Sequence, residues 1–321
     1  MALPYRKNEA KEWAKENIKG VWIATNTPFT PDFQVDWEGC RHNIRYVIDN
    51  LQIKGNFHAG MVGETFHQTI AERKRHLQIA VEESKGQMLT LSAPHCETPL
   101  VTLELVKYAE ELGAELTGPM NPRFYQGTMT EEGVFQYYKW IADQVNIAIF
   151  PLNQMEHGYL MSPQLICRLA NEIPNFVGIK NIAPLDHTRM VRSLCGDKII
   201  VSDADEENWL INLTAHGQEA YISSALSFLL QSKKLKLINE YTELAEKGEF
   251  AKALEVYKRL EPIRSALVRV TPPGKRQATH KYWGQQLGMA GGDGRVRPPY
   301  QQLTEAEKAA IRNAVQSSGL L

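Results

Sequence analysis

The sequence lacks several features that would assign it to a specialised class of protein. Its four cysteines are scattered without the spacing of a zinc site, which favours reduced thiols in a cytosolic protein. Lys and Arg number 36 against 37 Asp and Glu, so the net charge of −1 indicates no basic surface for nucleic acid or for a membrane. No apolar run approaches the length of a membrane span, and the N-terminus shows no signal-peptide core. We therefore expect a cytoplasmic protein with neither nucleic acid nor membrane as a partner.

Two further absences limit the chemistry. No cluster of histidines and carboxylates has the spacing of metal ligands, so we expect no metal centre. No glycine-rich turn follows the first predicted strand, residues 20–25, which argues against an open nucleotide-binding sheet. The sequence thus predicts a protein that works on a small molecule without a bound cofactor.

What the sequence does contain is a regular alternation of short apolar runs and helical patterns. The predicted strands are residues 20–25, 56–59, 88–92, 116–120, 147–152, 177–180, 199–202 and 220–224. The predicted helices between them are residues 36–50, 70–84, 99–111, 131–145, 162–173, 187–195 and 206–216. Eight strands alternating with helices predict an α/β protein with a TIM (β/α)8 barrel.

Segments outside this alternation predict two additions to the barrel. Residues 1–18 are polar and charged and predict a short N-terminal helical extension. Residues 19–230 then form the barrel, and residues 231–321 a C-terminal helical appendage. The appendage has predicted helices at 237–247, 250–268 and 304–316, with a turn-rich stretch at 288–299.

The run Phe176-Val177-Gly178-Ile179-Lys180-Asn181 carries the main functional hypothesis. Its apolar residues predict a buried parallel strand, and Ala183-Pro184 follows it. In a parallel barrel, the carboxyl end of each strand faces the active site, so Lys180 is expected there. Burial would lower the pKa of its amine and let it attack a carbonyl. The alternative is an ordinary lysine that reaches into solvent.

Five short motifs occur in an order that resembles a known superfamily. They are Thr27-Pro28-Phe29, Gly60-x-x-Gly63-Glu64, Pro122-x-x-Tyr125, Gly178-Ile179-Lys180 and Arg297-Pro298-Pro299. Over about residues 20 to 300, the chain resembles the class I, Schiff-base-forming lyases of the dihydrodipicolinate synthase and N-acetylneuraminate lyase superfamily. The resemblance implies that Lys180 condenses with the ketone of a 2-oxo acid such as pyruvate. It also implies a homo-oligomer, commonly a tetramer.

The same resemblance implies a substrate-carboxylate loop after the second strand. The family usually has two hydroxyl residues there, where this chain has Met61 and Val62, so only backbone amides would hold the carboxylate. The family's proton-carrying tyrosine on the fifth strand is also missing. Keeping Asn153, a candidate substrate contact, in register puts Leu152 at that position, and an ungapped alignment puts Phe150 there. Neither side chain moves a proton, which argues against a dihydrodipicolinate synthase.

An acidic segment after the seventh strand is similar to the acidic pair that N-acetylneuraminate lyases use on substrate hydroxyls. It makes Asp205 and Glu206 candidate substrate contacts, and Ser224, after the eighth strand, is another. The alternative is that these acidic residues only stabilise the start of a helix.

Four residues are candidates for the missing proton carrier. Tyr125 corresponds to the tyrosine that a neighbouring subunit lends in the family, and it could instead be structural. Tyr159 and His157 lie in the loop after the fifth strand and could reach the mouth of the barrel. His58 lies inside the second strand, where a histidine is more often packed than catalytic.

These residues leave three functions open. The leading hypothesis is an aldolase-type lyase with Lys180 as its covalent catalyst. A hydro-lyase of the sugar-acid dehydratase type would use the same Schiff base, and a catalytically impaired paralogue would only bind a keto acid. Borohydride trapping with pyruvate separates the enzymes from the binder.

Overall fold

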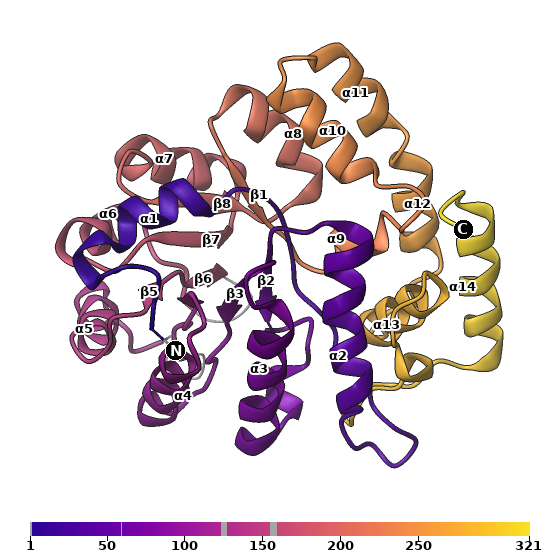
Figure 1. Cartoon of the computed structure of the whole chain (residues 1–321), viewed down its shortest axis with the longest axis horizontal. Helices are drawn as coiled ribbons and strands as arrows, with labels where there is room; N and C mark the ends of the chain where they lie inside the picture. Colours follow the sequence, from indigo (N-terminus) through magenta and orange to yellow (C-terminus); the bar gives the residue numbers. More distant parts are fainter. Residues whose placement is uncertain (1, 59, 123–126, 155–158) are drawn as a thin grey trace. The chain divides into compact units, whose positions relative to one another are not determined.

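The computed structural model describes residues 2–58, 60–122, 127–154 and 159–321. The chain forms two compact units, which are treated separately below. Unit 1 contains Met1–Gly20 and Leu89–Ile222, and unit 2 contains Val21–Met88 and Ser223–Leu321. In both units, parallel strands are connected through helices (Figure 1).

Unit 1 begins with a short helical segment and continues with alternating strands and helices. The N-terminal segment comprises η1 (Lys7–Glu9) and α1 (Ala10–Asn17). The strands that follow are β3 (Leu89–Ser92), β4 (Leu116–Thr117), β5 (Ala148–Ile149), β6 (Leu152–Gln154), β7 (Gly178–Ile182), β8 (Ile200–Asp203) and β9 (Ala220–Ile222). The helices are α4 (Pro99–Leu112), α5 (Glu131–Ala142), α6 (Pro163–Glu172), α7 (Leu185–Cys195) and α8 (Glu206–Ala215).

The strands of unit 1 pair in parallel, as the alternation predicts. β4 pairs with β3 and β5, and β7 pairs with β6 and β8. The predicted single strand 147–152 is wrong, because the structure divides it into β5 and β6 at Phe150 and Pro151. Proline has no N–H to donate to a ladder, so a strand seldom continues through it. The carbonyl of Pro151 still accepts a hydrogen bond from the N–H of Lys180 at 2.9 Å.

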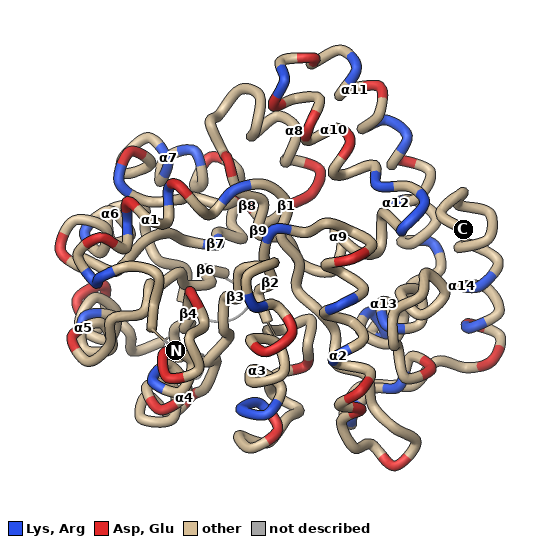
Figure 2. Tube along the Cα trace, viewed as in Figure 1, with Lys and Arg blue, Asp and Glu red and all other residues tan. Residues whose placement is uncertain are grey.

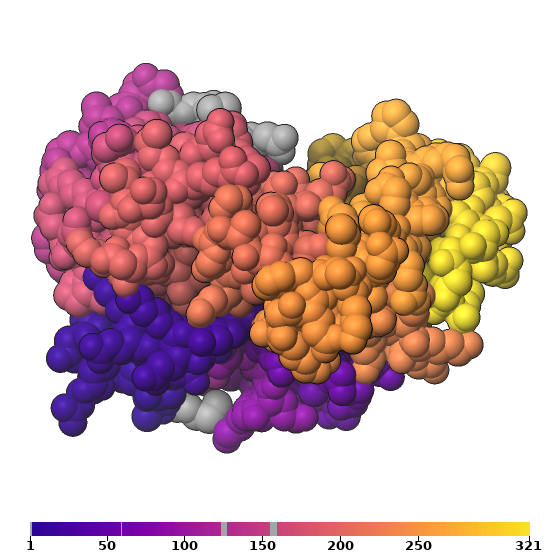
Figure 3. Space-filling model, turned by 90° about the horizontal axis from the view of Figure 1, so that it is seen from above, coloured from indigo at the N-terminus to yellow at the C-terminus, as the bar shows by residue number. Residues whose placement is uncertain are grey.

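Unit 2 combines two strands with most of the C-terminal helices. β1 (Gly20–Ile23) pairs in parallel with β2 (Gly55–His58). α2 (Trp37–Tyr46) continues into the π-helical turn η2 (Val47–Leu51), and η3 (Thr65–His67) precedes α3 (Ile70–Ser84). The later elements are α9 (Leu226–Leu229), α10 (Leu237–Glu246), α11 (Phe250–Lys258), α12 (Glu261–Arg269), α13 (Arg276–Gln286), η5 (Gly292–Gly294) and α14 (Glu305–Ser317). In Figure 3, the yellow C-terminal residues pack against orange residues of the same unit.

One prediction for the C-terminal helices is corrected, and one helix was not predicted. The predicted helix 250–268 is two helices, α11 and α12, because Pro262 lies in the first turn of α12. A proline inside a helix removes a hydrogen bond and clashes with the preceding turn, whereas the first turn accepts it. The sequence analysis also missed α13, which buries Lys281 and Gly284 beside aromatic residues and so shows no plain apolar face.

Side-chain and glycine caps mark several helix ends. Ser162 accepts a hydrogen bond from the N–H of Leu165, and Pro163 occupies the first turn of α6. Gly113 ends α4 with a φ of 85°, a conformation that glycine adopts without a steric penalty.

Charges are distributed evenly over the helices. Figure 2 shows acidic and basic residues interspersed along the outer helices of each unit. None of the described helices combines the length and the apolar character needed to cross a membrane. The predicted boundaries after residues 18 and 230 remain predictions, because the two compact units divide the chain at other positions.

Candidate active site

Lys180 is the central residue of β7, and the strand continues for two residues beyond it. Lys180 is only 4% exposed, although lysine is among the residues that are most seldom buried. Burial lowers the pKa of the amine to about 7. At neutral pH a large fraction of Lys180 is therefore the uncharged, nucleophilic amine.

The strand register identifies the neighbours of Lys180. Leu152 of β6 and Ser202 of β8 are its partners in the two adjacent ladders. Since partners in a parallel ladder project to the same face, these two side chains flank the lysine. Of the two residues that the sequence left open, Leu152 is therefore the one beside the amine, and it has no proton to transfer.

Phe150, the other alternative, has a packing contact instead. Its ring occupies the space next to Gly178, where an added Cβ would lie 2.1 Å from a ring carbon. Gly178 is therefore required by close approach of an aromatic ring. This explains why the strand carries glycine two residues before the lysine.

The face opposite Lys180 is held by a buried amide network. Asn153 donates from Nδ2 to Oδ1 of Asn181 at 2.8 Å, and Asn181 donates from Nδ2 to the hydroxyl of Thr188 at 2.8 Å. Oδ1 of Asn153 accepts from the N–H of Met161 at 2.9 Å. The network ties β6, β7 and α7 together and fixes the strand that carries the lysine. It also uses the amide atoms of Asn153 within the protein, so a substrate contact there remains a prediction.

The acidic segment after β8 is well bonded within unit 1. Asp203 is buried, its Oδ2 accepts from Asn208 and Asn212 at 3.0 and 3.1 Å, and burial raises its pKa. Asp205 is the N-cap of α8 and accepts from the N–H of Glu207 at 3.1 Å. Glu206 is fully buried in the first turn of that helix. The alternative of a helix-start role fits Asp205, and the substrate contacts of Asp205 and Glu206 remain predictions.

The structure gives less evidence on the two candidate tyrosines, Tyr125 and Tyr159. Tyr125 lies outside the described residues, as does the candidate His157. Tyr159 is partly buried, and its carbonyl accepts from Nδ2 of Asn121 at 3.0 Å. Burial, followed by the nearby charge of Glu131, raises the pKa of the Tyr159 phenol. A role for either residue in proton transfer remains a prediction.

His58 lies in unit 2, with its ring against α3. The ring meets that of His76 edge to face, with centroids 4.3 Å apart, and Nδ1 contacts Nδ2 of Asn56 at 3.1 Å. Burial, and then the neighbouring His76, holds the pKa of His58 well below its usual value. This is the geometry of a packed, neutral histidine, and proton transfer by His58 remains a prediction.

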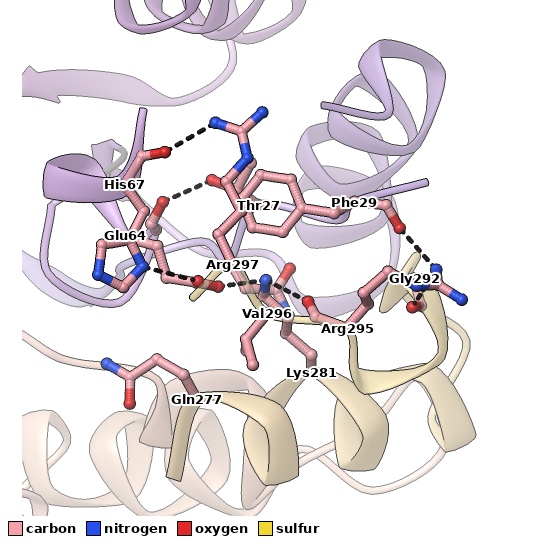
Figure 4. Close-up of polar contacts among 12 residues, drawn as sticks. Thr27, Phe29, Glu64, His67, Gln277, Lys281, Gly292, Arg295, Val296 and Arg297 are labelled. Atoms are coloured by element: carbon pink, nitrogen blue, oxygen red, sulfur yellow. Dashed lines mark hydrogen bonds and ion pairs between the residues drawn. The ribbon is translucent and has the colours of Figure 1, made fainter. Parts of the chain in front are cut away.

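The predicted carboxylate loop also belongs to unit 2. Met61 and Val62 are partly exposed, whereas Gly63 and Glu64 are buried. Figure 4 shows Glu64 directed at Lys281 of α13, with which it forms a buried ion pair. Sequence reasoning missed Lys281, because only the fold brings α13 to this loop.

Ser224 is partly buried in unit 2, and the described contacts involve its backbone. Its carbonyl accepts from the N–H of Ala24 at 3.1 Å and from the hydroxyl of Ser223 at 3.2 Å. Its predicted substrate contact therefore remains a prediction. Across the described ranges, no group of three or more His, Cys, Asp or Glu residues is arranged to hold a metal ion.

Comparison with known proteins assigns nearly the whole chain to one family. The model of the dihydrodipicolinate synthetase family matches residues 17–318. The 4-hydroxy-tetrahydrodipicolinate synthase of Methanopyrus kandleri is 29% identical over 308 residues, which cover 95% of this chain and 97% of the relative.

Solved structures agree with this assignment. Dihydrodipicolinate synthase from Thermotoga maritima is 25% identical with a TM-score of 0.81, covering 95% of this chain and 100% of that one. YagE, a prophage protein of the same family from E. coli K12 in complex with pyruvate, is 23% identical with a TM-score of 0.83. It covers 94% of this chain and 99% of its own, and it shows the fold. The chain therefore belongs to the dihydrodipicolinate synthetase family, with a (β/α)8 barrel, a C-terminal helical extension and the activity class of a class I lyase.

Proposed function

We propose that this protein is a Schiff-base-forming, aldolase-type lyase that acts on a 2-oxo acid such as pyruvate, with Lys180 as the covalent residue. One observation carries the proposal. Lys180 is a buried amine on a parallel strand whose pKa burial alone lowers to about 7. An amine in that state attacks a ketone at neutral pH, whereas an ordinary lysine is almost entirely protonated.

The chemistry follows from the amine. The neutral nitrogen adds to the ketone carbon to give a carbinolamine, and loss of water leaves an iminium ion. The electron pair of the bond between C3 and C4 of the bound acid then forms a C2=C3 double bond as the C=N pair moves to the positive nitrogen, and the C4 hydroxyl loses its proton and leaves as an aldehyde. The resulting enamine takes up a proton at C3 to give the iminium of pyruvate, and the reverse sequence forms the carbon–carbon bond. Addition of water to the final imine releases the product and regenerates the amine. By resemblance, backbone N–H groups around Met61 and Val62 bind the carboxylate of the 2-oxo acid.

Leu152, the residue beside Lys180, supports candidate functions that differ from that of the named relatives. Curated relatives carry the name 4-hydroxy-tetrahydrodipicolinate synthase. Leu152 flanks Lys180 and cannot relay a proton, and Met61 and Val62 replace the expected hydroxyls. This observation supports a hydro-lyase or a catalytically impaired keto-acid binder as the second candidates.

Borohydride trapping tests the proposal. The wild-type protein is incubated with pyruvate and borohydride, and the modified peptide is mapped by mass spectrometry. We expect one reduced adduct on Lys180, none in Lys180→Ala, and none on Lys281, which is equally buried but paired with Glu64. No adduct with any 2-oxo acid would contradict the proposal. Products from sugar acids then distinguish loss of water from release of pyruvate.

We also infer a cytoplasmic homo-oligomer from the resemblance. Analytical ultracentrifugation tests the oligomeric state directly. A monomer at micromolar concentration would contradict that part of the proposal.

A further inference from the structure

The loop that follows β2 contains an unusual backbone conformation at Glu64. This residue has a φ of 55° and a ψ of 43°, in the left-handed region that residues with a side chain seldom adopt. It is 3% exposed, and its N–H donates to the carbonyl of Met61 at 3.1 Å to close a turn. Such conformations persist where surrounding contacts hold them, and they are concentrated at functional sites.

Two side chains lie against the Glu64 carboxylate, Lys281 of α13 and His67 of η3. It forms an ion pair with Nζ of Lys281, and Nδ1 of His67 lies 3.4 Å away (Figure 4). Lys281 also donates to the carbonyl of Arg295 at 2.8 Å, and its Nζ lies 4.1 Å from the centre of the Phe29 ring. Burial lowers the pKa of Lys281 to about 8, and the Glu64 carboxylate opposes that shift. The pair is therefore fully enclosed by protein.

The carbonyl groups of the same loop are fixed as well. The Gly63 carbonyl accepts from the hydroxyl of Thr27 at 2.7 Å and from Nε2 of Gln68 at 2.6 Å. By contrast, the N–H groups of Met61, Val62 and Gly63 donate to no other residue in the part of the chain that the structure describes. The Gly63 carbonyl is thus hydrogen-bonded within the protein, and the three consecutive N–H groups can bind an anion.

We propose that Glu64 and Lys281 are positioning residues that hold the Met61–Gly63 amides in the geometry for binding the substrate carboxylate. This inference rests on the proposed function, in which the loop binds that carboxylate. Neither side chain touches the substrate in this account. They act through the backbone, by fixing the strained turn at Glu64 from α13.

The physical argument favours positioning over simple stabilisation. Removing two charges from water costs most of what their attraction returns, so a buried ion pair is weak evidence for stability. An apolar pair of similar volume would hold α13 against the loop about as well. An apolar pair would not fix the orientation of the turn in which Glu64 adopts the left-handed conformation. A small displacement of the amides that bind the carboxylate would then weaken substrate binding.

The test uses matched variants and the borohydride reaction. The double variant Glu64→Gln with Lys281→Met removes both charges and leaves no unpaired buried ion. Lys281→Met alone is the second variant, and Lys275→Met is the control, since Lys275 lies at the start of the same helix but pairs with Glu307 at 2.8 Å instead of with Glu64. For each, the trapped fraction is measured against pyruvate concentration, and folding is checked by circular dichroism and thermal melting.

We expect the half-saturating pyruvate concentration to rise about ten- to hundredfold in the double variant and in Lys281→Met, and to be unchanged in Lys275→Met. The trapping rate at saturating pyruvate should stay close to wild type, because Lys180 is intact. A folded double variant with wild-type half-saturation would overturn the inference while leaving the proposed function in place. If wild-type protein is not trapped at all, the proposed function fails and the positioning role fails with it.

Discussion

The N-terminal segment of unit 1 and the C-terminal helices of unit 2 are attached by contacts of different kinds. In unit 1, three lysines spaced four residues apart, Lys7, Lys11 and Lys15, lie on one face of the segment. Each donates to a backbone carbonyl in the last turn of a different helix or just beyond it, α5, α6 and α7 in turn. The acceptors are the carbonyls of Ala142, Ala170 and Asp197. These cations stabilise the negative ends of three helices.

In unit 2, the C-terminal helices are attached through charges that are removed from solvent. Lys281 pairs with Glu64, both fully buried, and Arg297 pairs with Glu72 at 2.6 Å, with both side chains mostly buried. We therefore expect burial, more than the number of charges, to determine how much each attachment contributes to stability. Exposed cations contribute tenths of a kcal/mol, whereas a broken buried pair leaves a costly unpaired ion.

The largest effect is expected at the buried pair. Lys281→Met leaves Glu64 buried without its cation and should lower the free energy of unfolding by about 3–5 kcal/mol. Urea denaturation followed by circular dichroism measures this loss. Lys275→Met is the control and should cost about 1 kcal/mol or less, because its pair with Glu307 is nearer to solvent. Equal losses in the two variants would remove the contrast between a fully buried and a partly exposed ion pair.

Acid should weaken unit 2 next most strongly. Burial lowers the pKa of His76 to about 4, below the value of about 6.5 in an unfolded chain. Above pH 6.5 both states are neutral, and as the pH falls from 6.5 towards 4 the unfolded state binds the proton more tightly. Stability is therefore lost over that window, by roughly 3 kcal/mol for His76 alone.

Urea midpoints at pH 7, 5.5 and 4.5 measure this dependence. His76→Gln should show a shallower fall across the same range than wild type. A wild-type stability that is flat between pH 6.5 and 4.5 would contradict the buried, neutral state of the His58 and His76 pair.

The buried hydroxyl of Tyr5, near the N-terminal segment's helix, is expected to contribute more to the free energy of unfolding than each of the three lysines does. The Tyr5 hydroxyl accepts from the N–H of Ala148 in β5 at 2.8 Å and donates to the carbonyl of Glu115. Tyr5→Phe leaves that buried N–H without an acceptor, so we expect a loss of about 1–2 kcal/mol. Thermal melting of the matched pair checks it. A change below a few tenths of a kcal/mol would show that water replaces the hydroxyl.

The smallest effect is expected from the lysines. Lys11→Met removes a half-buried cation from the end of α6 and should cost about 0.3–1 kcal/mol. Raising the salt concentration should reduce the difference between wild type and variant, since screening weakens exposed charges. A loss as large as that of Tyr5→Phe, independent of salt, would mean that the aliphatic stem of the lysine matters more than its charge.

The sequence predicted those features that depend on local chemistry. Apolar runs and helical patterns indicated most strands and helices, and the strand around Lys180 was predicted because its apolar residues adjoin a single charge. The sequence did not predict the register of the strands. Only the pairing of β6 with β7 decides between Leu152 and Phe150 beside the lysine, and that pairing follows the break at Pro151.

Long-range contacts were equally inaccessible from the sequence. Lys281 stands 217 positions after Glu64 in a polar helix, and nothing local marks it as the partner of a buried carboxylate. Ser202 was likewise missed, because it is related to Lys180 only through the ladder between β7 and β8. Features that depend on which strands and helices meet require the structure.

The central claim is that Lys180 is an amine whose burial leaves it uncharged near neutral pH. The most direct test is the rate of borohydride-trapped adduct formation at fixed low pyruvate, measured from pH 5.5 to 9.5. The account predicts a rate that rises with pH through an apparent pKa near 7 and then levels off, because only the neutral amine attacks. A rate that keeps rising to pH 9.5, as for a solvated lysine, would contradict it.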